Sequence, residues 1–99
     1  ILVGELNWKR GQWHHLVATF HNANSGRPDA SAAVYIDGQR RGWMQGYEHN
    51  LTWDIQDLTI GLGQRYSGAI DEFLILDQAL DADQIQQLYQ LPGPASDLL

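Results

Sequence analysis

The stretch YSGAIDEFLILDQALDADQIQQLY, residues 66–89, decides the fold because a strand-like pattern passes into a capped helix within a few residues. Residues 68–76 form a β-branched and aromatic run, which favours an extended strand. Asp71 and Glu72 are neighbours in this run, so on a strand their side chains point to opposite faces of the sheet. They cannot work together as a catalytic acid and base.

The second half of the stretch predicts a short helix from about residue 82 to residue 90. Asp81 is the expected N-cap, and Gln84 three residues later is its partner in a capping box. One apolar stripe, which has to be buried against a sheet, has three members: Ile85, Leu88 and Tyr89. The segment LPGP then ends the helix, and residues 92–99 are interpreted as a linker or tail.

The rest of the chain alternates short apolar runs with turn-forming residues, which is typical of an all-β protein. The expected strands are residues 2–8, 13–20, 32–36, 39–44, 56–63 and 68–76. Asp37 and Gly38 predict a two-residue hairpin, because both positions of such a turn need a positive φ. The polar residues 21–31 are expected to form a surface loop, and Trp13 is interpreted as a core residue.

Composition and charge exclude several classes of partner. The chain has 99 residues, 43% of them hydrophobic, which allows one small domain. Its 12 acidic and 6 basic residues give a net charge of -6, which disfavours binding to nucleic acid or an anionic membrane. No apolar run approaches the ~20 residues of a membrane span, so no membrane insertion is expected. The absence of Cys excludes disulfides and thiolate metal sites.

An ordered series of motifs resembles the laminin-G-like (concanavalin-A-like) jelly-roll domains, a group that includes the pentraxins. The series runs from residue 12 to residue 89: Trp13 with HHLVATF, VYIDG, Ile60-Gly61, GAIDEFLILDQAL and the helix through Leu88 and Tyr89. The resemblance implies an all-β fold, an antiparallel β-sandwich (jelly roll) with one short C-terminal helix. Residues 1–91 are similar to the C-terminal half of such a domain. The resemblance also implies an extracellular or periplasmic location.

Half a sandwich has an inner face without a partner sheet, and so short a chain buries too little surface to tolerate that. The N-terminal half of the same domain, or another chain, is therefore expected to complete the sandwich. If the segment is alone, its open sheet edges favour dimerisation or strand exchange.

Calcium is the cofactor that the resemblance raises, although no cofactor is predicted from the residues themselves. Some jelly-roll relatives bind calcium through an Asp on the last strand together with carbonyls of N-terminal strands, and Asp71 occupies a matching position. The alternative is that Asp71 caps backbone amides or pairs with an Arg. His14 and His15 do not suggest a metal site, because neighbours on a strand point to opposite faces.

Aromatic residues near a strand end suggest a binding surface. Trp43 and Tyr47 can supply faces that stack on a sugar ring, and Arg40, Arg41 and Gln45 can supply hydrogen bonds. The alternative is that the two aromatic side chains pack over the open end of the sandwich. Which holds depends on whether they are exposed beside polar side chains.

Three functions stay open. The first is a non-catalytic recognition or adhesion module of a larger extracytoplasmic protein, with a glycan or protein ligand. The second is a structural accessory domain that docks a neighbouring catalytic domain and has no ligand of its own. The third, half of a glycan hydrolase, lacks support because no two carboxylates alternate on one strand and no G-x-S-x-G motif occurs. The chain is therefore not expected to be an enzyme.

Overall fold

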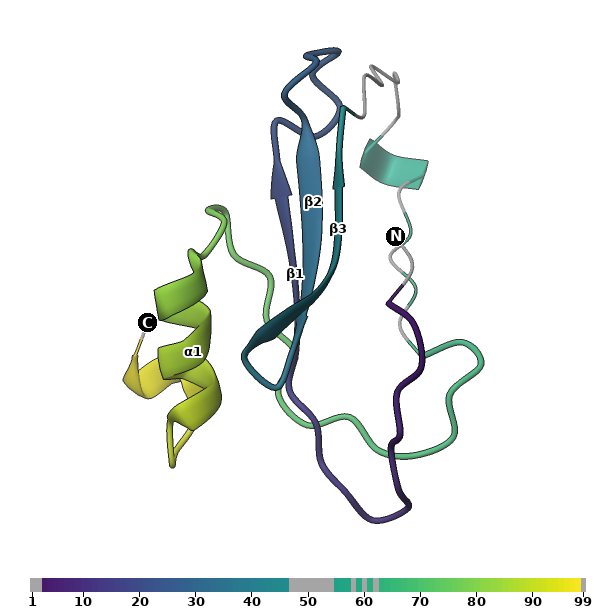
Figure 1. Ribbon diagram of the computed structural model, residues 1–99, viewed down its shortest axis with the longest axis vertical. Helices are drawn as coiled ribbons and strands as arrows, with labels where there is room; N and C mark the ends of the chain where they lie inside the picture. Colours follow the sequence, from purple (N-terminus) through teal and green to yellow (C-terminus); the bar gives the residue numbers. More distant parts are fainter. Residues whose placement is uncertain (1–2, 47–54, 58, 60, 62, 99) are drawn as a thin grey trace.

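The computed structural model describes residues 3–46, 55–57, 59, 61 and 63–98. In these residues the elements are β1 (Leu16–His21), β2 (Ser31–Ile36), β3 (Gln39–Gln45), a 3₁₀ turn η1 (Ile55–Asp57), α1 (Ala82–Gln90) and a second 3₁₀ turn η2 (Ala95–Asp97). Strands in an antiparallel sheet and one short C-terminal helix agree with the predicted partial jelly roll. In Figure 1 α1 stands to one side of the sheet, and the N-terminal segment runs along the other.

The three strands form one antiparallel sheet in the order β1-β2-β3. The turn between β2 and β3 is the predicted two-residue hairpin, with φ of 51° at Asp37 and 81° at Gly38. A longer loop joins β1 to β2, and it contains two non-glycine residues with positive φ, Asn22 and Asn24. Asparagine tolerates this backbone region better than most residues, which explains its use here.

Side-chain alternation gives the sheet two different faces. Thr19, Ala33 and Trp43 lie opposite one another across the three strands and so share one face. Their neighbours Phe20, Ala32 and Met44 share the other. Most of the buried apolar residues belong to β2 or to its ends: Ala30, Ala32, Ala33 and Ile36. The core of the described residues is therefore small and centred on the middle strand.

The helix α1 confirms the predicted capping box. The backbone amide of Gln84 donates to Oδ1 of Asp81 at 2.8 Å, and the Asp81 amide donates to Oε1 of Gln84 at 2.9 Å. Ile85 is the residue that the helix buries completely, while Tyr89 stays 43% exposed. Beyond the helix, the amide of Ala95 in η2 donates to Oε1 of Glu72 at 3.2 Å.

Three predicted strands are not strands among the described residues. Residues 3–8 and residues 68–76 carry no strand assignment, and residues 55–57 form η1 where a strand was predicted to begin at residue 56. Residues 58, 60 and 62 lie outside the described part of the chain. The physical reason is pairing: a strand needs a neighbour for its backbone groups, and residues 68–76 take part in no backbone-to-backbone hydrogen bond with any described residue.

Trp13 also differs from the prediction. Its side chain is 70% exposed, so it is not a core residue here. The strand β1 begins only at Leu16, three residues later, and Trp13 lies in the irregular segment before it. Alternation along a strand therefore does not control which way Trp13 points.

Candidate functional site

The sheet face that carries Trp43 is hollowed. A depression of about 290 Å³ lies between this face and the segment that leads into α1. Its lining combines residues of all three strands with three residues before the helix: Thr19, His21, Ser31, Ala32, Ala33, Tyr35, Arg40, Trp43, Ala79, Leu80 and Asp81. The small Ala33 side chain on β2 leaves the space open, and larger polar and aromatic side chains surround it.

Trp43 and Arg40, two of the predicted ligand residues, are brought together in this hollow. The guanidinium carbon of Arg40 lies 5.5 Å from the centroid of the Trp43 ring, a cation–π arrangement. The Trp43 side chain is 52% exposed, so part of its aromatic face is open to solvent. The sequence alone left open whether this aromatic side chain is exposed beside polar groups or packed over the end of the sandwich. Trp43 is exposed beside a charged hydrogen-bond donor.

A β-bulge explains why these two residues share a face. Three positions separate them, so a regular strand would send their side chains to opposite sides. The register shifts between Val34 and Tyr35, so that Trp43 lies opposite Ala33 while Arg40 lies opposite Tyr35. The extra residue on β3 restores both side chains to the same side of the sheet.

The other predicted ligand residues have different surroundings. Arg41, the residue added by the bulge, donates from Nη2 to the backbone oxygen of Glu5 at 3.3 Å. Gln45 is exposed at the end of β3, opposite Ser31. Tyr47 lies outside the described residues.

Sequence reasoning missed several residues of the hollow. Tyr35 and His21 share the face of Trp43, and strand alternation on the paired register could have placed them there. The segment of residues 79–81 carries no comparable signal, because its position depends on how the helix docks. Asp81 lines the hollow, yet one of its carboxylate oxygens already accepts the Gln84 amide. Among the described lining residues it is the one carboxylate, whereas glycoside hydrolysis requires a pair.

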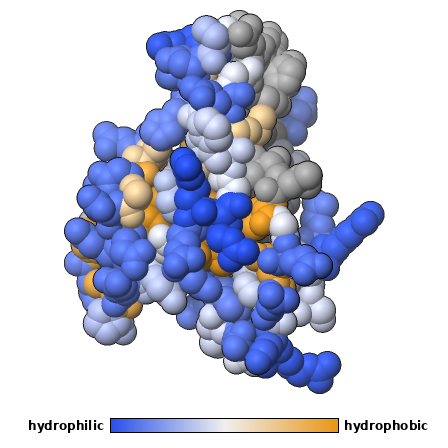
Figure 2. Space-filling view, in the orientation of Figure 1, coloured by the Kyte–Doolittle hydropathy of each residue, from blue (hydrophilic) through white to orange (hydrophobic). Residues whose placement is uncertain are grey.

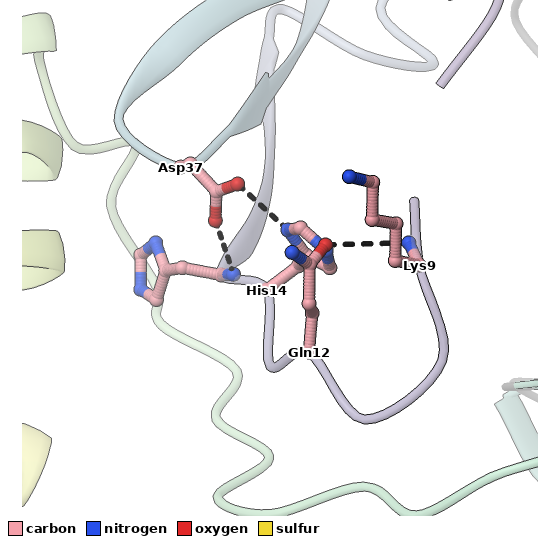
Figure 3. Close-up of polar contacts among 5 residues, drawn as sticks. Lys9, Gln12, His14 and Asp37 are labelled. Carbon is pink, nitrogen blue, oxygen red and sulfur yellow. Dashed lines mark hydrogen bonds and ion pairs between the residues drawn. The ribbon is translucent and has the colours of Figure 1, made fainter. Parts of the chain in front are cut away.

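A second polar cluster surrounds the turn between β2 and β3 (Figure 3). The Asp37 carboxylate accepts a hydrogen bond from Nδ1 of His14 at 2.8 Å and another from the backbone amide of His15 at 2.9 Å. The His14 ring stacks on the Trp8 ring, with centroids 4.3 Å apart and an angle of 7° between the planes. The His15 and Tyr89 rings are tilted relative to each other, with centroids 5.9 Å apart. The cluster thus joins the N-terminal segment, the hairpin and α1.

The electrostatics of this cluster follow from burial and hydrogen bonding. Partial burial lowers the pKa of His15, because it disfavours the charged ring, and the nearby Asp37 carboxylate opposes this only in part. Burial disfavours the charged form of Asp37 as well, but the hydrogen bonds from His14 and His15 outweigh it and hold the pKa of Asp37 below its ordinary value. These contacts account for both histidines as structural residues.

The predicted calcium ligand Asp71 lies in the unpaired residues 68–76, where its side chain is exposed. No group of three or more His, Cys, Asp or Glu residues that could hold a metal ion occurs within the described part of the chain. The described residues therefore do not assemble a calcium donor set by themselves. The predicted site also needs carbonyls of N-terminal strands, so Asp71 as a ligand stays a prediction.

Comparison with known proteins identifies the fold family. A laminin G family model, described as the concanavalin A-like lectin/glucanases superfamily, matches residues 2–86. The chain belongs to this superfamily. A search of curated proteins finds no match. The match covers β1 to β3, the hollow and the start of α1.

The superfamily fold also occurs in a solved structure that resembles this chain. It is the 2.1 Å crystal structure of residues 221–444 of an S-layer domain-containing protein from Clostridium thermocellum, with a TM-score of 0.63 and 24% sequence identity. The alignment covers 87% of this chain and 43% of that one, so this chain spans less than half of the solved structure.

In the described residues, no helix is both long and apolar enough to cross a membrane.

Proposed function

We propose that this superfamily member is a non-catalytic recognition module of a larger extracytoplasmic protein, and that its ligand is a glycan bound in the hollow beside Trp43. The observation that carries the proposal is the half-exposed Trp43 ring with Arg40 next to it. A large apolar side chain that stays exposed beside hydrogen-bonding groups is a common feature of binding surfaces.

The chemistry of the hollow suits a sugar. An aromatic face can pack against the C–H groups of a pyranose ring, and the guanidinium of Arg40 and the hydroxyls of Thr19 and Ser31 can bind its oxygen atoms. The hollow is open to solvent and small, so we expect an isolated sugar to bind with a Kd on the order of ~0.1 to 1 mM. Useful avidity would then come from several copies displayed together.

A non-catalytic role fits the carboxylates as well. The Asp81 carboxylate caps α1, and no second carboxylate lines the hollow among the described residues. The superfamily name includes glucanases, and the S-layer domain-containing protein has the same fold at low identity, so neither decides the activity. The support for an extracytoplasmic module is the superfamily together with the solved S-layer relative.

Glycan-array binding followed by calorimetry tests the proposal. Trp43→Ala should weaken the binding of any glycan found by at least about 10-fold, since it removes the stacking face. Arg40→Gln should weaken it as well, through loss of the charged donor. Trp13→Ala is the matched control, because Trp13 is exposed and lies outside the hollow, and it should leave binding unchanged.

Three results would contradict the proposal. Glycan binding that is unaffected by Trp43→Ala would place the site elsewhere, for example around Tyr47, which Tyr47→Ala would reveal. Turnover of a glycan would show that the module is catalytic. Absence of binding to every glycan on the array would favour the alternative of a structural accessory domain.

A further inference from the structure

The turn residues Asp37 and Gly38 carry a reactivity that is separate from the proposed glycan site. Asp37 is the one Asp or Asn of the sequence that a Gly follows. In such a pair the backbone nitrogen of the Gly can attack the side-chain carboxyl carbon of the Asp, because no Cβ on the Gly hinders the approach. A five-membered succinimide ring forms, and its hydrolysis gives isoaspartate. The sequence thus contains one favourable site for a spontaneous change of its backbone.

The fold holds the reacting carboxylate by both of its oxygen atoms (Figure 3). Oδ2 accepts from Nδ1 of His14 at 2.8 Å, and Oδ1 accepts from the backbone amide of His15 at 2.9 Å. The Asp37 amide donates in turn to the backbone oxygen of His15 at 2.9 Å. Ring closure expels one carboxyl oxygen and joins the carboxyl carbon to the Gly38 nitrogen. At least one of the two side-chain hydrogen bonds therefore has to break before the ring can form.

The second reacting residue, Gly38, is confined by the helix. A Cβ on Gly38 would collide with the side chain of Gln86 and lie 3.1 Å from Cδ2 of Tyr89, so the turn packs directly against α1. The His15 ring lies beside the same Tyr89 ring, with centroids 5.9 Å apart. The turn is thus held by the segment before β1 through its carboxylate and by α1 through its glycine.

Ionisation and water access control the remaining chemistry. The carboxyl group has to be protonated so that its oxygen can leave as water. Burial disfavours the charged form of Asp37, but the hydrogen bonds from His14 and His15 outweigh it and hold the pKa of Asp37 below its ordinary value, which keeps the protonated fraction low. The Asp37 side chain is 31% exposed, and in Figure 2 hydrophilic residues make up most of the surface where α1 and the hairpin lie. Water therefore has access to a ring that forms here.

We propose that Asp37 is a modification site whose conversion to isoaspartate is controlled by its neighbours: it proceeds only when the contacts of the carboxylate with His14 and His15 open locally, and the product no longer holds α1 against the hairpin. The folded chain thus protects the site, and each local opening exposes it to an irreversible change.

The atoms balance with water as the only co-reactant. In the open state the Gly38 nitrogen bonds to Cγ of Asp37 and loses its proton, and the carboxyl OH leaves with a proton as water. A second water molecule then adds to one of the two ring carbonyls. Addition at Cγ restores aspartate, whereas addition at the main-chain carbonyl carbon of Asp37 breaks its bond to the Gly38 nitrogen. The chain then runs through Cβ and Cγ, which is isoaspartate.

The product does not fit the turn. Isoaspartate adds one carbon to the backbone of a two-residue hairpin, and its carboxylate is attached directly to Cα. This shorter carboxylate cannot reach both His14 and His15, and the longer backbone moves Gly38 against a helix that already leaves no room for a Cβ. The helix α1 has nine residues, too few to stay folded in water without tertiary contacts, so its contact with the hairpin should be lost.

Isoaspartate formation in the full-length protein tests the proposal. The folded protein and the same protein unfolded in urea are incubated in parallel, and isoaspartate is located by mass spectrometry with fragmentation that distinguishes it from aspartate. The unfolded protein should form it at position 37 at least about 10-fold faster, since no opening is required. Below the unfolding transition the rate should hardly depend on urea, because a local opening exposes little surface.

Substitutions identify the controlling contact. His14→Ala removes one of the two side-chain hydrogen bonds and should speed the conversion in the folded protein by roughly 5-fold, the equilibrium effect of one such bond. His21→Ala is the matched control, because His21 is exposed at the other end of β1, and it should leave the rate unchanged. Asp37→Glu should remove the signal, because its longer side chain closes a ring far more slowly. In the converted fraction, hydrogen exchange of the α1 amides should be faster than in the unconverted one.

Five outcomes would overturn the proposal. Absence of isoaspartate at position 37 in the unfolded protein would show that the site is not reactive. Equal rates in folded and unfolded protein, or an unchanged rate in His14→Ala, would show that the contacts of the carboxylate do not control it. A rate that rises with urea in step with global unfolding would exclude a local opening. Unchanged protection of the α1 amides in the converted fraction would exclude release of the helix.

Discussion

Replacing Asp81 by Ala should destabilise the chain through its helix. The helix has nine residues, which is too short to be stable in water without its cap and its tertiary contact through Ile85. The substitution removes the acceptor of the 2.8 Å bond from the Gln84 amide and leaves that amide exposed to water. Because water can replace part of the lost bond, we expect a cost of about 1 kcal/mol in the free energy of unfolding, in the middle of the range for N-caps.

Urea denaturation followed by far-ultraviolet circular dichroism measures this cost as a shift of the midpoint at constant slope. In a thermal scan, about 1 kcal/mol corresponds to roughly 4–8 °C for a chain of this size. Asp81→Asn is the decisive control, because asparagine caps as well as aspartate but lacks its charge. Asp83→Ala controls for loss of an acidic residue in the first turn without loss of the cap. If Asp81→Ala and Asp81→Asn have the same midpoint, the cap contributes nothing and the argument is wrong.

Three further predictions concern other sites. The lowered pKa of His15 means that its side chain binds a proton more readily in the unfolded chain than in the folded one. The free energy of unfolding should therefore be highest above about pH 6.5 and should fall as the pH drops from there towards the pKa of His15 in the folded chain. His15→Gln should flatten this part of a plot of stability against pH. Gly38→Ala should cost about 1 kcal/mol or more in a denaturation experiment, because φ is 81° there and a Cβ would collide with Gln86, whereas Gly4→Ala has a similar φ but open space and should cost less. If Asp71 is a calcium ligand in the complete domain, calcium should raise the Tm and Asp71→Ala should abolish the rise; a rise that survives the substitution would exclude Asp71.

Local signals in the sequence predicted local structure well. The capping box at Asp81 and the turn at Asp37 depend on residues three positions apart or fewer, so their geometry follows from short-range chemistry. Residues 68–76 show the limit of such signals, because a strand pattern becomes a strand only when a neighbour satisfies its backbone.

The candidate site was predicted in part for the same reason. Trp43 and Arg40 were singled out by residue type and by their place near a strand end. Their contact depends on the β-bulge in β3, opposite Val34 and Tyr35, which no residue pattern in the sequence indicates. Residues 79–81 line the hollow only because α1 docks beside the sheet, and that docking depends on contacts between residues far apart in the sequence.

The turn residue Asp37 shows how tertiary contacts can select between two residues that are equivalent locally. Asn and Asp suit this turn position about equally well as far as the backbone is concerned. A carboxylate can accept from the His14 ring and from the His15 amide at the same time, whereas an amide side chain has a single acceptor atom. Asn would have to donate its NH₂ group to Nδ1 and so move the ring proton to Nε2 of His14, a buried atom with no hydrogen-bond partner among the described residues. Asp is therefore favoured over Asn at position 37 because its carboxylate keeps the ring proton of His14 on Nδ1, where it has a hydrogen-bond acceptor.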